Sequence, residues 1–86
     1  MFIKDPDATL DYKREWADWL GTDTIATSTW IVPEGITEGE TSHDATSATI
    51  WLSGGTVGEV YELTNRVTTT GGRTDDRSFN VQIRNR

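Results

Sequence analysis

The chain has 86 residues, of which 34% are hydrophobic and 26% charged, and its formal net charge is −6. A chain of this length forms one small domain that buries only about 60–65% of its unfolded surface, so a few large side chains must supply much of the core. The acidity disfavours binding to nucleic acid or to anionic lipid, since both carry negative charge. Cysteine is absent, which excludes disulfides, thiolate nucleophiles and thiolate metal ligands.

The sequence offers no segment for membrane insertion or secretion. No run of apolar residues exceeds three, so a transmembrane helix is not expected. The N-terminal residues lack the apolar stretch of a signal peptide. We therefore expect the protein to be made and retained in the cytoplasm unless another structure carries it out.

Alternation of apolar and polar residues predicts strands in the first half of the chain. Residues 9–16 place Leu10, Tyr12 and Trp16 on one face, which Arg14 interrupts. Residues 17–20 lose the alternation and predict a single helical turn or a tight bend before Gly21. Residues 24–32 resume the alternation, with one face made of Ala26, Ser28, Trp30 and Val32 and the other of Ile25, Thr27, Thr29 and Ile31.

The second half continues this pattern after a polar interval. Residues 34–46 predict a loop with at most a short edge strand. Residues 48–53 predict a strand, and residues 60–68 and 77–84 predict two more, joined by a glycine-containing hairpin loop over 69–76. The core faces of the last two strands are expected to carry Tyr61, Leu63, polar Asn65 and Val67, then Phe79, Val81 and Ile83.

Many short strands with frequent turns predict an all-β fold, a small antiparallel immunoglobulin-like β-sandwich, with a small closed barrel as the alternative. The immunoglobulin-like assignment depends on Tyr61, which stands two residues before Leu63 as in a tyrosine corner; simple core packing is the other interpretation. The domain is expected over residues 9–86. Residues 1–8 are expected to form an N-terminal arm, because Pro6 and its acidic neighbours disfavour a strand there, and removing the arm should leave the fold intact.

The residue pattern argues against catalysis and against a bound cofactor or metal. His43 is the only histidine, and its immediate neighbours Ser42 and Asp44 cannot converge with it as a catalytic triad. The carboxylates are spread along the chain and match no calcium loop. A glycosidase pair is disfavoured because so small a sandwich has little concave volume. We therefore expect no catalytic, cofactor or metal residues and no small-molecule substrate.

Interaction residues are the remaining candidates. Trp16 and Trp30 fall on apolar faces and are expected in the core, whereas Trp51 points opposite to Ile50 and Leu52. Trp51 is thus an interface anchor, part of a second core layer or a platform for a sugar. Residues 1–62 hold twelve acidic and three basic residues, while residues 63–86 hold five basic and two acidic ones. This division predicts either solvated faces or a molecule whose ends attract partners of opposite charge, and the candidate interface residues are Phe2, Ile3, Trp51, Arg73 and Arg77.

Long parts of the sequence also resemble a known family. The strings at residues 4–12, 16–20, 23–25, 28–30, 51–56, 61–69 and 72–78 resemble small virion proteins of tailed bacteriophages, described as fibre-to-tail adaptors or minor tail structural proteins. The resemblance implies a non-enzymatic virion protein that contacts tail, fibre or neck subunits, in several symmetric copies. A head decoration or head-to-tail joining protein and a carbohydrate-binding module are the alternatives.

Overall fold

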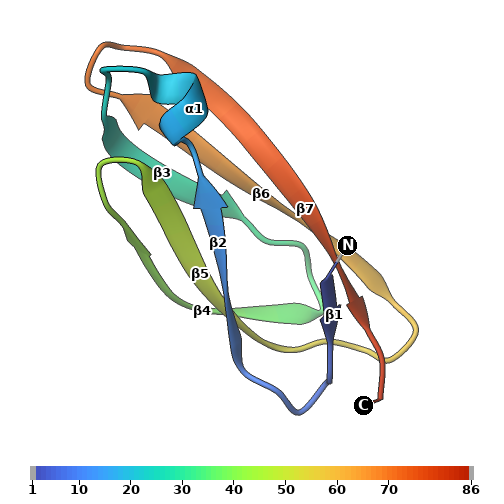
Figure 1. Cartoon of the computed structure of the whole chain (residues 1–86). Helices are drawn as coiled ribbons and strands as arrows, with labels where there is room; N and C mark the ends of the chain where they lie inside the picture. The colour runs from blue at the N-terminus through green and yellow to red at the C-terminus, as the bar shows by residue number, and fades with distance from the viewer. Residues whose placement is uncertain (1, 86) are drawn as a thin grey trace.

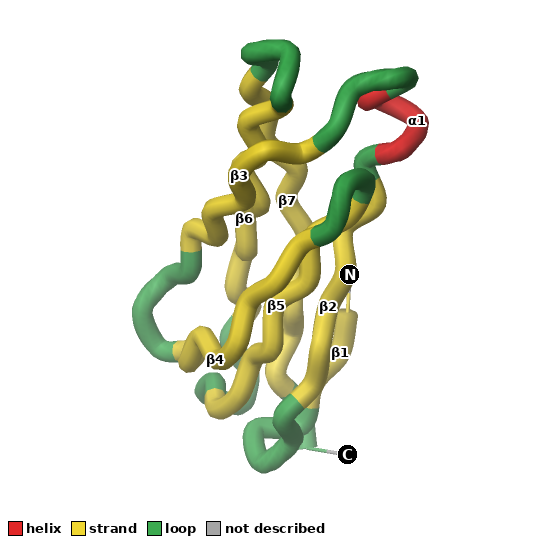
Figure 2. Tube along the Cα trace, turned by 90° about the vertical axis from the view of Figure 1, so that its left-hand side faces the viewer, coloured by secondary structure: helices red, strands yellow, loops and turns green. Residues whose placement is uncertain are grey.

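The computed structural model describes residues 2–85, which form seven strands and one helical turn (Figure 1). In chain order these are β1 (Phe2–Lys4), β2 (Leu10–Glu15), α1 (Ala17–Leu20), β3 (Ile25–Ile31), β4 (Ile36–His43), β5 (Ser47–Gly54), β6 (Val60–Thr69) and β7 (Thr74–Ile83). One sheet has the order β1-β7-β6-β3 and the other β2-β5-β4. The two sheets face each other in an elongated body of 42 × 20 × 19 Å (Figure 2), so the predicted small β-sandwich is confirmed.

The core fills the space between the sheets with side chains from alternate strand positions. On β6 and β7 the buried residues are those expected from the sequence: Tyr61, Leu63, Asn65, Val67, Phe79, Val81 and Ile83. The opposite sheet contributes Ile50 and Leu52, both fully buried. Burying each such large aliphatic or aromatic side chain stabilises the fold by about 1.5–3 kcal/mol.

Asn65 belongs to a buried hydrogen-bonded group at one end of this core. Its Oδ1 accepts from the indole Nε1 of Trp16 at 2.9 Å, and its Nδ2 donates to Ser28 Oγ at 2.9 Å and to the carbonyl oxygen of Thr29 at 3.2 Å. A buried amide is tolerated only when its hydrogen bonds are made. These contacts therefore fix the position of Trp16, just before α1, relative to β3 and β6.

The strand order bears on the immunoglobulin-like assignment. The orders β7-β6-β3 and β2-β5-β4 correspond to the G-F-C and B-E-D orders of immunoglobulin-type sandwiches. Tyr61, at the start of β6, accepts a hydrogen bond at its phenolic oxygen from the backbone N–H of Thr56 at 3.0 Å. Trp30 is buried on β3, the strand that corresponds to C. We interpret the topology as immunoglobulin-like on these three features.

The N-terminal segment differs from expectation. Residues 2–4 are not an arm outside the sheet: they form β1, which pairs in parallel with β7, Phe2 opposite Val81 and Lys4 opposite Ile83. Pro6 does not prevent this because it lies beyond the strand, in a turn where the N–H of Ala8 donates to the carbonyl oxygen of Asp5 at 3.0 Å. One pair of strands is thus parallel in an otherwise antiparallel sandwich. Met1, the first residue of the expected arm, and Arg86 lie outside the described residues.

The polar interval also differs, since residues 36–43 form the eight-residue strand β4 rather than a loop with a short edge strand. Only Ile36 is buried on β4, so the strand shows no apolar alternation. Its backbone pairing with β5 defines it instead, with a register shift between Glu38 and Thr41. The sequence signal fails because an edge strand at the margin of the core needs few apolar residues.

A second register shift changes the facing of β3. The irregularity between Ile25 and Thr27 in the β3–β6 ladder turns the backbone, so that Ile25 is buried on the same side as Trp30. A strict period of two had placed these two side chains on opposite faces. Ala26, expected beside Trp30, is exposed. A β-bulge inserts one residue and reverses the alternation, which periodicity alone does not register.

Candidate interaction surfaces

The described residues contain few groups that could perform chemistry. Within residues 2–85 the surface shows no pocket and no cluster of three or more potential metal ligands. No helix in this part of the chain is long and apolar enough to cross a membrane. His43 is exposed at the end of β4. Its neighbour Asp44 stabilises the turn between β4 and β5, because its Oδ1 accepts hydrogen bonds from the N–H groups of Thr46 and Ser47 at 2.9 and 2.8 Å. These N–H groups and the Ser47 hydroxyl lower the pKa of the Asp44 carboxyl.

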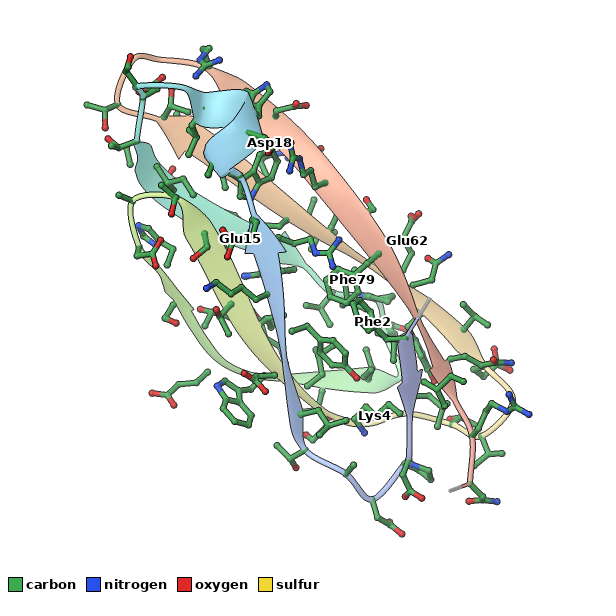
Figure 3. All side chains as sticks on the ribbon, in the orientation of Figure 1. Phe2, Lys4, Glu15, Asp18, Glu62 and Phe79 are labelled. Carbon is green, nitrogen blue, oxygen red and sulfur yellow. The ribbon has the colours of Figure 1, made fainter. Side chains whose placement is uncertain are left out.

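Arg77, a candidate interface residue, is engaged inside the chain. Its guanidinium lies 4.5 Å from the centroid of the Trp16 ring and donates to the carbonyl oxygen of Glu15 and, at 3.4 Å, to the carboxylate of Asp18. Glu15 ends β2 and Asp18 lies on α1, both at the same end of the molecule (Figure 3). Arg77 thus ties β7 to the start of α1.

Arg73 has a similar position at the β6–β7 hairpin. Its guanidinium stacks 4.3 Å from the Trp19 ring centroid and donates to the carbonyl oxygens of Trp19 and Leu20 at 3.3 and 2.9 Å. It also forms an ion pair with Asp23 at 3.3 Å. Arg73 and Arg77 therefore hold α1 against the sandwich, and their contribution to an interface with another protein stays a prediction.

The Asp23 carboxylate accepts hydrogen bonds from several groups at the end of the molecule that contains α1. The Thr69 hydroxyl, the N–H groups of Thr24 and Gly71 and the guanidinium of Arg73 together lower its pKa from 3.8 to about 2, against the opposing effect of burial. The carboxylate thus connects the segment after α1 with the β6–β7 hairpin.

Acidification should weaken the fold through Asp23. The pKa of Asp23 is lower in the folded chain than in the unfolded one. The ionised carboxylate therefore contributes fully to the free energy of unfolding above pH 4, and this contribution is lost as the pH falls from about 4 to about 2. Urea unfolding of Asp23→Asn should give a lower stability than wild type at pH 6 and a difference that shrinks at pH 2.5. Glu62→Gln, on the exposed face of β6, is the control. A difference between wild type and Asp23→Asn that is independent of pH would contradict this assignment.

The charge division along the sequence is largely compensated in space. Arg66 forms a two-point ion pair with Asp76, with distances of 2.8 and 2.9 Å. Arg73 pairs with Asp23 and Arg77 with Asp18. Three arginines of the positive C-terminal part are therefore paired with carboxylates, and the interpretation of a molecule with two oppositely charged ends loses most of its support.

Phe2 and Ile3 lie on opposite faces of β1. The Phe2 ring packs 5.1 Å from the Tyr12 ring and 5.4 Å from the Phe79 ring, while remaining 39% exposed (Figure 3). The Arg14 guanidinium, which interrupts the apolar face of β2, covers the Phe79 and Phe2 rings at 4.8 and 5.7 Å. Phe2 thus closes the edge of the core, and Ile3, on the other face of β1, is exposed to a similar degree.

Trp51 lies on the outer face of β5, the central strand of the three-stranded sheet, with 40% of its surface exposed. Ile50 and Leu52 on either side are fully buried, as the alternation predicted. The sandwich has no further layer over this face within residues 2–85, so a second core layer around Trp51 is wrong. An interface anchor and a sugar platform remain as its possible functions.

Sequence reasoning missed the free edge of β4 as a functional feature. This strand pairs with β5 on one side only and exposes seven of its eight residues. The available signal was the acidic, glycine-containing composition of residues 34–44, which is typical of an edge strand that resists unwanted pairing.

A comparison with protein families gives a match that covers most of the chain. The family model described as "Podophage GP4 fiber-tail adaptor protein gp77" matches residues 4–82. A comparison with curated proteins gives no match. The matched range runs from the last residue of β1 almost to the end of β7 and includes all of β2, α1, β3, β4, β5 and β6. The chain therefore belongs to the podophage fibre-tail adaptor family.

Proposed function

We propose that this protein is a non-enzymatic structural component of a phage particle that joins the tail to the tail fibre through protein–protein contacts. The observation that carries the proposal is the family match over residues 4–82. The fold agrees with it, since the described residues offer a sandwich with exposed sheet faces and strand edges rather than a pocket. The proposed partners are tail and fibre subunits, and the proposed location is the virion.

The test is fibre attachment in particles that lack the protein. Phage produced without it should assemble heads and tails but carry no fibres, and adding the purified protein should restore fibre attachment. Electron microscopy of the particles and fibre content by gel measure both results. Fibres that stay attached without the protein would contradict the proposal, and separated heads and tails would indicate a head-to-tail joining protein.

A further inference from the structure

The outer face of the β2-β5-β4 sheet combines an exposed tryptophan with uncompensated negative charge. We define the Trp51 surface as Trp51, Gly39, Asp11 and Glu40. Asp11 stands directly opposite Trp51 in the β2–β5 ladder, so both side chains point to the same face. Gly39 lies beside Trp51 on β4, and Gly39 and Glu40 form the irregular part of the β4–β5 ladder, between the pairs Glu38–Leu52 and Thr41–Ile50.

Gly39 lies close to the backbone and Cβ of Trp51. A Cβ at this position would lie 3.2 Å from the carbonyl oxygen and 3.3 Å from the Cβ of Trp51, tighter than ordinary contact. Because glycine has no side chain, position 39 of β4 places no atom against the backbone and Cβ of Trp51. Among the described residues, the rings covered by a guanidinium are Phe2, Trp16, Trp19 and Phe79, and Trp51 is not one of them.

The strands near the Trp51 ring carry an excess of acidic residues, because a long stretch of the chain contains no lysine or arginine. Lysine and arginine are absent between Arg14 and Arg66, so β3, β4 and β5 carry no cationic side chain of either type. The Lys13 ammonium on the outer face of β2 forms an ion pair with Glu15 at 3.1 Å. Asp11 and Glu40 are exposed and have no such partner on these strands.

Protection of a sheet edge explains only part of this arrangement. Glutamates and a bulge on β4 discourage pairing with another strand. They do not account for an exposed indole on the middle strand, because a large apolar side chain attracts contacts rather than preventing them. The face, rather than the edge of β4, is therefore the place where a partner fits.

We infer that the Trp51 surface binds an arginine-bearing segment of the partner protein, an inference that rests on the proposed function. A guanidinium stacks favourably on an indole, and the carboxylates of Asp11 and Glu40 attract it and disfavour an acidic partner. The same pairing already occurs within this chain at Arg73 on Trp19 and Arg77 on Trp16. The Trp51 surface offers the aromatic half of that pair without the arginine.

A peptide titration tests the chemistry directly. The capped peptide Gly-Arg-Gly-Arg-Gly should shift the indole N–H resonance of Trp51 saturably, with the resonance assigned by its loss in Trp51→Thr. The same peptide with glutamate in place of arginine, and a neutral oligosaccharide, should leave it unchanged. The inference would be overturned if both peptides gave equal shifts or if the arginine peptide gave none. It would also be overturned if the oligosaccharide alone gave a shift, and Trp51 would then be a sugar platform.

Binding to the phage partner tests the surface in its context. Trp51→Thr should lower affinity for the isolated tail or fibre subunit at least tenfold, while Trp51→Tyr should recover part of the loss because the ring is kept. Ile31→Thr, a matched exposed position of 45% exposure on the other sheet, should bind as wild type does. Asp11→Asn with Glu40→Gln should weaken binding several-fold and reduce its salt dependence.

The two proposals fail in different ways. If the protein does not attach fibres, particles lacking it keep their fibres, whereas the arginine peptide still shifts the Trp51 resonance and supports the inference. If the Trp51 surface is not the contact, wild type restores fibre attachment and Trp51→Thr restores it equally well. That second result would overturn the inference and leave the proposed function standing.

Discussion

Replacing Leu63 with aspartate should leave the chain without a cooperative unfolding transition. Leu63 is fully buried on β6 and faces the same core as Phe79, its partner across the β6–β7 ladder. An unpaired charge at this position costs several kcal/mol, against a total stability of about 5–10 kcal/mol for a domain of this kind. Thermal melts followed by near- and far-ultraviolet circular dichroism measure the effect.

Val60→Asp is the matched control for this variant, because Val60 lies on the same strand but on its outer face, with 47% of its surface exposed. It should melt cooperatively and close to wild type. If Leu63→Asp also melted cooperatively and close to wild type, the facing assigned to β6 would be incorrect. Phe79→Asp, on the neighbouring strand, should reproduce the loss seen with Leu63→Asp.

Alternation predicted the parts of the fold in which side chains face a full core. β5, β6 and β7 have partners on both sides, so their inner residues must be apolar and the period of two is visible in the sequence. Tyr61 was identifiable for a related reason, since its distance from Leu63 and the glycine-rich bend before it fix a local geometry. These features depend on the local sequence or on the burial of alternate side chains, and both are visible in the amino-acid sequence.

The incorrect predictions concern positions where distant backbone pairing decides the structure. β4 has one buried residue and depends on β5 for its register, and β1 has three residues that depend on β7. The bulge in β3 depends on how that strand fits β6. Neither composition nor period reports a pairing between segments more than 70 residues apart, such as Phe2 and Val81.

The candidate site was predicted less completely than the fold. Trp51 was found because its neighbours Ile50 and Leu52 fix its orientation. Arg73 and Arg77 were chosen for charge alone, and the structure shows each of them in contact with a tryptophan and with backbone carbonyl groups near α1. Charge counts along a sequence do not reveal which ions are already paired.

Lys4 makes β1 part of the core rather than a detachable arm. Its side chain is fully buried, and its Nζ donates to the carbonyl oxygens of Gly54 at 2.8 Å and Asp5 at 2.9 Å. Burial lowers the pKa of the amine, although the nearby carboxylates of Asp5 and Asp7 oppose this effect. A buried ammonium is retained only where its hydrogen bonds are made, so Lys4 connects β1 firmly to the end of β5.

Removing residues 1–4 should therefore lower the free energy of unfolding by roughly 3–6 kcal/mol. The truncation removes the contacts of Phe2 with Tyr12 and Phe79 and the ladder between β1 and β7. It also leaves the carbonyl group of Gly54 without the hydrogen bond from Lys4. Urea unfolding at neutral pH measures the change. Lys4→Ala should show a large part of it, whereas Ile3→Thr, on the outer face of the same strand, should stay within about 1 kcal/mol of wild type. A truncated protein as stable as the full chain would restore the original expectation of an independent arm. Its failure to attach fibres would then place a partner contact at Phe2 and Ile3.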